Sequence, residues 1–315
     1  MCPMHVLVCG TNYGRIYLEA IRLGGARYCL AGILARGSNL SREVASEFGA
    51  PLYRCVNDLA PTIDLACAAM GASGHVAVLS LLSRGINVLC EHPHTPSRLQ
   101  AALEAAACGG LCFHVNGHFA DLDAAAAFIC HCRQQSETAP PSFFHVTATD
   151  RSLYAALDIL HRVMVSFAPF EFHLTSRLVP FTIVQGLLGN VPVAFQLQRS
   201  ADRRPLPDAS PAYLVDHRIA AVFPSGTLTL LSMNGPVVWN ANPNCVAGPA
   251  EPLFAVVHES RALTAELFYQ QRVAANFAAI ETLVKDMSKR VRPLEQAPDY
   301  LLEVSRAWEM LGALL

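Results

Sequence analysis

The stretch His5-Val-Leu-Val-Cys-Gly-Thr-Asn-Tyr-Gly14 decides the fold of this chain. It is a short apolar run that breaks into small, turn-forming residues and then enters a helix-like pattern from Arg15 to Leu23. This order is typical of a buried strand, a tight turn and a helix N-terminus, where outward-pointing N–H groups and the helix dipole favour a diphosphate. We therefore expect a dinucleotide site here. The expected contacts are Gly10, Thr11, Asn12, Tyr13 and Gly14.

The glycine spacing of this turn departs from the usual G-x-G-x-x-G pattern. Counting back from Gly14, the first two glycine slots hold Cys9 and Thr11, and Gly10 lies between them. Many strand-to-helix turns in α/β domains carry two glycines for steric reasons alone. The turn by itself leaves both interpretations open.

The composition describes a globular chain with a large core. Charged residues make up 15% of the 315 residues and hydrophobic residues 52%, so one large or two ordinary domains can be filled, with apolar surface left for a subunit interface. The net charge of −2 gives no indication of binding to nucleic acid or a general membrane surface. No apolar run reaches the roughly 18 residues of a membrane span, and the first residues lack signal-peptide features, so we expect a cytoplasmic protein.

The eleven cysteines do not follow a metal-binding pattern. No C-x-x-C occurs, and Cys130 and Cys132 have no second pair at zinc spacing. We expect small core residues and no metal site.

Residues 1–118 alternate between apolar runs and helix-like segments, which predicts a parallel sheet covered on both faces. Ligands of such sheets bind at the carboxyl ends of the strands. The expected strands are His5–Cys9, Tyr28–Leu34, Leu65–Ala69, Ile86–Cys90 and Leu111–Val115. The expected helices are Tyr13–Leu23, Ser41–Phe48, His75–Arg84 and Pro96–Ala107.

Residues 119–295 have a different sequence pattern, in which strand-like runs follow one another across turns. This pattern predicts an α+β domain with a mixed or antiparallel sheet. Arg199–Pro211 indicates an exposed loop, and residues 296–315 a helix that packs back on the body. The expected strands are Phe143–Thr149, Glu171–Leu178, Val193–Arg199, Tyr213–Phe223 and Thr227–Met233. The expected helices are Asp121–Cys132, Leu153–Phe167 and Leu253–Ser288.

The segment after the second strand predicts the type of dinucleotide. An acid about 20 residues past the glycine turn would bind the ribose 2′-hydroxyl of NAD, but no acid occurs before Glu43. Guanidinium and hydroxyl groups occur instead and suit a 2′-phosphate, which favours NADP(H). The other interpretation is a solvated loop with Ser41 capping the next helix. The expected contacts are Ala35, Arg36, Gly37, Ser38 and Arg42.

Two further strand ends carry candidate residues. After the third strand, small residues let a ribose approach the backbone, and we expect contacts from Ala69, Ser73 and His75. After the fourth strand comes Glu91-His92-Pro93, a stiff place for a catalytic group that also contacts the cofactor.

With these residues in hand, the chain resembles the Gfo/Idh/MocA oxidoreductases, most of which carry Glu-Lys-Pro where this chain has Glu91-His92-Pro93. The segments Val8–Gly14 and Ala31–Ser38, together with Glu91-His92-Pro93, are similar to one branch, the thiazolinyl imine reductases of siderophore assembly lines. The resemblance covers the N-terminal half well and the remainder more loosely.

The resemblance implies an α/β fold with a Rossmann NADP(H)-binding domain over residues 1–118 and a substrate and dimerisation domain with an open sheet over 119–295. It also implies NADPH-dependent reduction of a thiazoline C=N bond to a thiazolidine. The substrate is tethered to a carrier domain of a nonribosomal peptide synthetase, in siderophore lines of the yersiniabactin and pyochelin type. A homodimer is common in the superfamily.

Imine reduction needs a general acid, and His92, in the family's catalytic slot, is the first candidate. The alternative is a structural histidine with Glu91 or a water as the proton source. The branch's tyrosine after the fifth strand is missing, so its role is absent or falls to His118. Asp158 and His161 are a further pair, one residue short of the superfamily's Asp-x-x-x-His motif, and an i,i+3 surface pair is the other interpretation of them. Tyr154 precedes Asp158 by one helical turn.

Two other functions remain open at this point. One is an NAD(P)-dependent sugar or cyclitol dehydrogenase of the same superfamily, in which the histidine would serve as a base. The other is a non-catalytic sensor that binds NADPH and signals through a partner.

Overall fold

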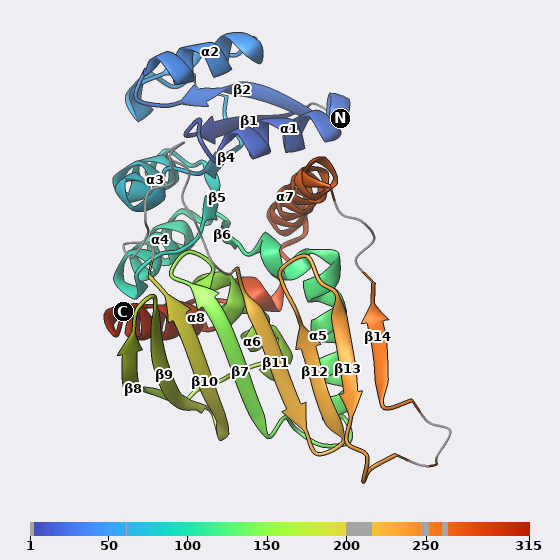
Figure 1. Ribbon diagram of the computed structural model, residues 1–315. Coiled ribbons are helices and arrows are strands. Elements are labelled where there is room, and N and C mark those ends of the chain that lie inside the picture. The colour runs from blue at the N-terminus through green and yellow to red at the C-terminus, as the bar shows by residue number, and fades with distance from the viewer. Residues whose placement is uncertain (1–2, 61, 200–215, 247, 249–251, 260–263) are drawn as a thin grey trace. The chain divides into compact units, whose positions relative to one another are not determined.

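The computed structural model describes residues 3–60, 62–199, 216–246, 248, 252–259 and 264–315 (Figure 1). The chain divides into two compact units. The first comprises Met1–His118 with Glu266–Leu302, and the second comprises Phe119–Ala265 with Glu303–Leu315. Each unit is built around one sheet, and the predicted α/β class with a parallel and a mixed sheet is confirmed.

The first unit contains a six-stranded parallel sheet in the order β3-β2-β1-β4-β5-β6. Its strands are β1 (Met4–Cys9), β2 (Tyr28–Leu34), β3 (Leu52–Tyr53), β4 (Leu65–Ala68), β5 (Asn87–Glu91) and β6 (Phe113–Asn116). Its helices are α1 (Arg15–Leu23), α2 (Asn39–Glu47), α3 (His75–Ser83) and α4 (Pro96–Gly109).

Apolar residues on both faces explain why these segments form central strands. All four residues from Val6 to Cys9 are buried, as are all four of β4, so neither strand has a solvent face. The five predicted strands and four predicted helices are confirmed with small shifts at their ends. The two-residue strand β3 was not predicted because it is too short to carry a periodic pattern.

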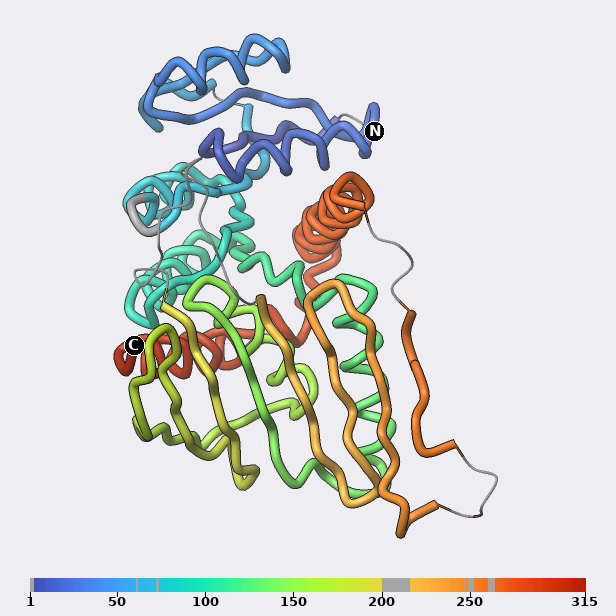
Figure 2. The backbone as a smooth tube through the Cα atoms, viewed as in Figure 1, coloured from blue at the N-terminus to red at the C-terminus, as the bar shows by residue number. Residues whose placement is uncertain are grey.

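Helix α7 (Ala265–Lys289) packs on the first unit rather than on the one that precedes it in the chain (Figure 2). Val273, Ile280 and Leu283 join the core that includes β1, β2 and β4. Residues 266–302 therefore group with the first sheet. The sequence placed residues 266–295 of this segment in the domain of residues 119–295 and the remainder in the C-terminal helix.

The second unit contains an eight-stranded sheet in the order β14-β13-β12-β11-β7-β10-β9-β8, antiparallel except for the pair β7 and β10. Helices α5 (Asp123–Ser136) and α6 (Leu153–Met164) lie against one of its faces (Figure 1). Its strands are β7 (Phe143–Thr149), β8 (Phe170–Leu178), β9 (Phe181–Leu188), β10 (Val191–Gln198), β11 (Arg218–Phe223), β12 (Gly226–Leu230), β13 (Val237–Ala241) and β14 (Phe254–His258).

Some expected elements of this half differ from the structure. The helix expected over Leu253–Ser288 is wrong at its start, because Phe254–His258 pairs with β13 as an edge strand and α7 begins only at Ala265. Strands β9 and β13 were not predicted. The expected loop over Arg199–Pro211 lies outside the described residues apart from Arg199, as does the start of the strand expected over Tyr213–Phe223.

The C-terminal helix α8 (Pro298–Ala313) lies within the range expected for it, with the turn Leu294–Gln296 before it. Among the described residues, no helix combines the length and apolar character that crossing a membrane requires.

Candidate functional site

The turn between β1 and α1 is a close-packed backbone cradle that only glycine fits. Gly10 has φ +94°, and a Cβ there would lie 2.5 Å from the Ala69 carbonyl oxygen. A Cβ on Gly14 would lie 2.0 Å from the Gly10 carbonyl oxygen. The first turn of α1 carries no acidic residue, so nothing in it neutralises the positive end of the helix dipole. These features fit the diphosphate of a dinucleotide.

A pocket of about 260 Å³ lies beside this turn, and cationic and aromatic side chains line it. Arg272, on α7, places its guanidinium 5.4 Å from the centroid of the Tyr13 ring, within range of a cation–π contact. Arg15 is paired with Glu47 at 2.5 Å. The lining residues are Asn12, Tyr13, Arg15, Ile16, Tyr269 and Arg272.

The loop from β2 to α2 holds the residues expected at a 2′-phosphate. Ser38, rather than Ser41, caps α2: its hydroxyl accepts from the Ser41 N–H at 3.2 Å. Arg42 donates to the Gly37 carbonyl oxygen at 2.5 Å and so fastens the loop. Arg36 is exposed, directly after Ala35, whose N–H bonds the Tyr53 carbonyl oxygen. One of the two predicted guanidinium groups is therefore committed to the loop itself.

The structure adds Arg54 to this loop, a residue that the sequence did not single out. Gly37 has φ +80°, and a Cβ there would lie 2.6 Å from the Nε atom of Arg54. The parallel pairing of Leu34 with Tyr53 brings the ends of β2 and β3 together and explains this contact. Within the described chain, neither Arg36 nor Arg54 forms an ion pair. Two guanidinium groups thus remain for an anion.

The end of β4 offers mainly backbone. Ala69 donates its N–H to the Cys9 carbonyl oxygen at 2.8 Å and borders Gly10. His75 begins α3, is half-buried, and has its pKa lowered by burial and by Arg98. Ser73 lies in the 3₁₀ turn Gly71–Gly74.

The end of β5 places His92 against the end of β6. Its Nδ1 atom lies 2.6 Å from the Asn116 carbonyl oxygen and 3.5 Å from the Glu91 carboxylate. A carbonyl oxygen only accepts, so Nδ1 carries a hydrogen. Burial raises the pKa of the Glu91 carboxyl, and the nearby His92 ring, with hydrogen bonds from Tyr17 and Asn116, opposes that rise.

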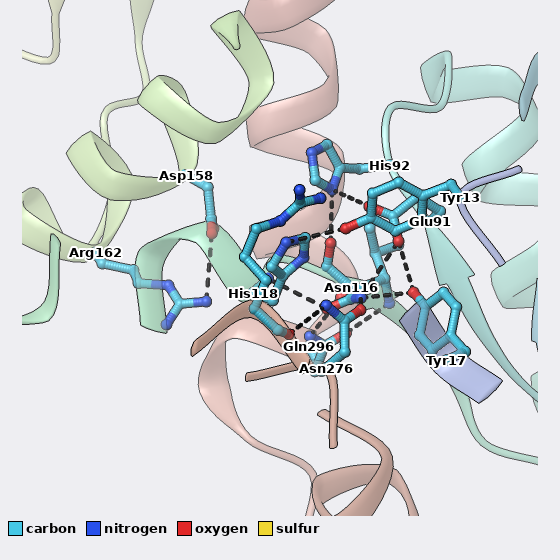
Figure 3. Close-up of polar contacts among 12 residues, drawn as sticks. Tyr13, Tyr17, Glu91, His92, Asn116, His118, Asp158, Arg162, Asn276 and Gln296 are labelled. Carbon is cyan, nitrogen blue, oxygen red and sulfur yellow. Dashed lines mark hydrogen bonds and ion pairs between the residues drawn. The ribbon is translucent and has the colours of Figure 1, made fainter. Parts of the chain in front are cut away.

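Asn116, the last residue of β6, is the centre of this network (Figure 3). Its side-chain amide donates to the Tyr17 hydroxyl at 2.6 Å and to Asn276 Oδ1 at 2.7 Å. Tyr17 in turn donates to the Glu91 carboxylate at 2.6 Å. The Asn116 side-chain oxygen accepts the His118 N–H at 3.2 Å. Every candidate group at this strand end therefore touches Asn116.

His118 is completely buried and pairs with a tyrosine from the glycine turn. Its Nε2 atom lies 3.0 Å from the Tyr13 hydroxyl, and its ring centroid is 6.4 Å from that of His92. Burial, followed by the His92 and Arg272 charges, holds the pKa of His118 well below its ordinary value. Burial and Glu91 raise the pKa of Tyr13. Both groups are therefore neutral near pH 7.

Asp158 and His161 belong to the second unit and are not the surface pair that was one expectation. Both are buried, and each has a different partner: Asp158 pairs with Arg162 at 3.3 Å and His161 with Glu303 at 3.4 Å. Glu303 also accepts the N–H of Phe167 at 2.5 Å. These contacts fasten α6 to its surroundings. Tyr154, on the same helix, is buried, and its pKa is raised by burial.

Some residues of the site were missed, and one of them carried a signal. Asn276 sits in the apolar stripe Val273, Ile280 and Leu283 of α7, at helical spacing, where a polar side chain indicates a buried hydrogen bond. Arg54 and Tyr17 had no comparable pattern. Among the described residues, no cluster of three or more histidine, cysteine or acidic side chains is arranged to hold a metal ion.

Comparison with protein families matches both halves of the chain. Residues 4–117 match the Gfo/Idh/MocA model, described as the oxidoreductase family with an NAD-binding Rossmann fold. Residues 139–240 match the model described as thiazolinyl imine reductase Irp3-like, C-terminal. No curated protein sequence gives a significant match.

Solved structures share the fold over nearly the whole chain. A dehydrogenase from Chromobacterium violaceum has a TM-score of 0.74 at 14% identity, covering 99% of this chain and 95% of that one. GenD2 from gentamicin A biosynthesis, in complex with NAD, has 0.71 at 13%, covering 98% and 93%. UDP-N-acetylglucosamine 3-dehydrogenase GnnA from Acidithiobacillus ferrooxidans has 0.70 at 15%, covering 98% and 96%. At these identities the likeness concerns the fold alone.

Proposed function

We propose that this chain, an oxidoreductase with an NAD-binding Rossmann fold, uses NADPH to reduce a thiazoline C=N bond to a thiazolidine. The Irp3-like match over residues 139–240 supports the substrate class. The structural observation that carries the proposal is the contact of His92 Nδ1 with the Asn116 carbonyl oxygen at 2.6 Å, because it fixes which ring nitrogen can exchange a proton.

Reduction of an imine needs a hydride at carbon and a proton at nitrogen. Bound NADPH supplies the hydride. The chain supplies the proton through the doubly protonated form of His92, whose Nδ1–H stays on the Asn116 carbonyl while Nε2 gives up its hydrogen and the ring becomes neutral. A positioned general acid of this kind contributes roughly 10²–10⁴-fold to the rate.

His118 is the weaker candidate for the acid. A ring that is neutral near pH 7 has no spare proton to donate, and burial keeps His118 in that form. Its Nε2 atom is also engaged by the Tyr13 hydroxyl. We assign the Tyr13–His118 pair a structural role beside the His92 ring.

NADPH rather than NADH fits the β2–α2 loop. No acid is available there to bind a ribose hydroxyl, and two guanidinium groups without ion pairs, Arg36 and Arg54, flank Gly37. Ser38 and Arg42 form hydrogen bonds within the loop itself. In this proposal Arg36 and Arg54 therefore bind the charged phosphate.

The protein partner in this proposal is the carrier domain of a nonribosomal peptide synthetase that presents the thiazoline, in a siderophore line of the yersiniabactin or pyochelin type. A homodimer in the cytoplasm belongs to the same proposal, since the 52% hydrophobic composition leaves apolar surface for an interface.

The direct test compares two substrate classes on the purified protein. A thiazoline-containing thioester is assayed with NADPH, and a panel of sugars and cyclitols with NAD⁺ and NADP⁺. The proposal predicts turnover of the thioester alone. Oxidation of a sugar or cyclitol instead would establish the dehydrogenase, and NADPH binding with no turnover of either class would favour a sensor.

A further inference from the structure

A helix far along the chain reaches the network that holds His92. Asn276, on α7, is completely buried, and its Oδ1 atom lies 2.7 Å from the side-chain nitrogen of Asn116 (Figure 3). Asn116 is itself buried at the end of β6, and its carbonyl oxygen holds His92. One side-chain path from α7 toward the candidate acid therefore runs through the two asparagines to Glu91, whose carboxylate lies 3.3 Å from the Asn116 side-chain nitrogen and 3.5 Å from His92 Nδ1.

The polarity of the link is fixed at both ends by backbone groups. The His118 N–H can only donate, so the side-chain atom of Asn116 that faces it is the oxygen. The Arg272 carbonyl can only accept, so the Asn276 atom 2.8 Å from it is the nitrogen. The Asn116 side-chain nitrogen therefore faces the Asn276 side-chain oxygen, so Asn116 is the donor and Asn276 the acceptor.

We propose that Asn276 is a positioning residue that orients the Asn116 side chain and, through the Glu91 carboxylate, holds His92 with its hydrogen on Nδ1. The inference deepens the proposed function, because it assumes that His92 is the acid of that reaction. Without the Asn276 acceptor, one N–H of Asn116 loses its partner in a site that water does not reach, and the amide then favours another orientation. Such a turn would release the contacts of the Asn116 side chain to Tyr17, to the His118 N–H and to the Glu91 carboxylate. That carboxylate faces His92 Nδ1, so its release would free the hydrogen on this nitrogen.

The test replaces Asn276 by leucine, which has similar volume and no acceptor, and observes the histidine rings by ¹⁵N NMR in the full-length protein. We expect the wild-type His92 signals of an Nδ1-protonated ring and, in Asn276→Leu, signals of exchanging tautomers. With the thiazoline thioester, kcat should fall roughly 10- to 100-fold, because small displacements of a reacting group have effects of this size. The Kd for NADPH should stay within about twofold.

Thr282→Val is the matched control on the same helix, because within the described part of the chain the Thr282 hydroxyl bonds its own helix alone, at the Ala278 carbonyl. It should leave the His92 signals unchanged. Unchanged His92 signals in Asn276→Leu would overturn the proposal, and so would parallel losses of NADPH affinity and kcat.

Asn276→Ser guards against a leucine variant that does not fold. Its hydroxyl can donate to the Arg272 carbonyl four residues earlier and accept the Asn116 hydrogen, so the Nδ1-protonated signals should persist, and their loss would contradict the proposal. The NMR readout needs no substrate. If the protein does not reduce a thiazoline but the His92 signals still change in Asn276→Leu, the proposed function is wrong and the positioning role of Asn276 is supported.

Discussion

The Nδ1 atom of His92 lies 2.6 Å from the backbone carbonyl oxygen of Asn116, across the ends of β5 and β6. A side chain at one strand end is thus held by the main chain of the next strand. Once Nε2 has given up its proton, the ring keeps one hydrogen, on Nδ1, and one lone pair, on Nε2.

Removing the His92 ring should abolish most of the chemistry without removing cofactor binding. In His92→Asn we expect kcat with a thiazoline thioester to fall by about 10²–10⁴-fold, with the Kd for NADPH within a few-fold of wild type. NADPH oxidation and fluorescence titration measure the two quantities. His173→Asn is the control, because its side chain is 73% exposed on the second unit. A fall in kcat of less than threefold would remove His92 as the acid.

Arg54 and Arg36 should each discriminate NADPH from NADH. In Arg54→Ala and Arg36→Ala the Kd for NADPH should rise roughly 10- to 100-fold, as expected for a charge-assisted hydrogen bond of about 1.5–3 kcal/mol, while the Kd for NADH changes less than twofold. Lys289→Ala, an exposed change of the same charge on α7, should alter neither. Equal losses for the two cofactors would rule out a 2′-phosphate contact.

A methyl group on Gly14 should disrupt the diphosphate cradle. The added Cβ would meet the Gly10 carbonyl oxygen at 2.0 Å, so the turn must shift, and we expect dinucleotide binding to fall at least tenfold. Such overpacking costs about 1–3 kcal/mol of stability, which thermal melting would detect. Gly312→Ala is the control, because its Cβ meets nothing within 4 Å. Unchanged binding in Gly14→Ala would contradict the cradle.

The stability of the protein should fall on acidification through His217. This residue precedes β11 and is buried, and neither ring nitrogen has a hydrogen-bond partner within the described part of the chain. Burial lowers its pKa to about 4. Because the folded pKa is depressed, its stabilisation is complete above the ordinary value near 6.5 and is lost as the pH falls from there toward 4.

From pH 7 to pH 5 this group alone should remove about 2 kcal/mol from the free energy of unfolding. Chemical denaturation at both pH values measures the loss, and His217→Leu should reduce it while the exposed control His173→Leu leaves it intact. An identical pH dependence in wild type and His217→Leu would refute the assignment.

The sequence predicted five of the six strands of the first unit, because these strands are plain apolar runs in the core of the sheet. Val6–Cys9 is one example, and the residues that follow each strand were correctly placed at one edge of the sheet. Asn276 and Asn116 are 160 residues apart in the sequence, and no local pattern specifies the hydrogen bond between them. Arg54 follows a strand of two residues, and its position depends on pairing with β2.

The edge strand Phe254–His258 shows a different limit of the sequence. Its apolar residues fit a buried helix as well as a strand, and only its pairing with β13 decides between them. Asp158 and His161 fit a surface pair by spacing, and only the positions of Arg162 and Glu303 show that each is buried with another partner. In both cases long-range contacts determine what the local pattern leaves open.

Isotope transfer from the cofactor tests whether this chain delivers a hydride from NADPH to the thiazoline carbon. C4-deuterated NADPH is incubated with wild-type protein and a thiazoline thioester, and the product is examined by mass spectrometry. We expect a thiazolidine carrying one deuterium on carbon, with the yield greatly reduced in His92→Asn. A thiazoline recovered unchanged, by a protein shown to bind NADPH, would contradict this expectation.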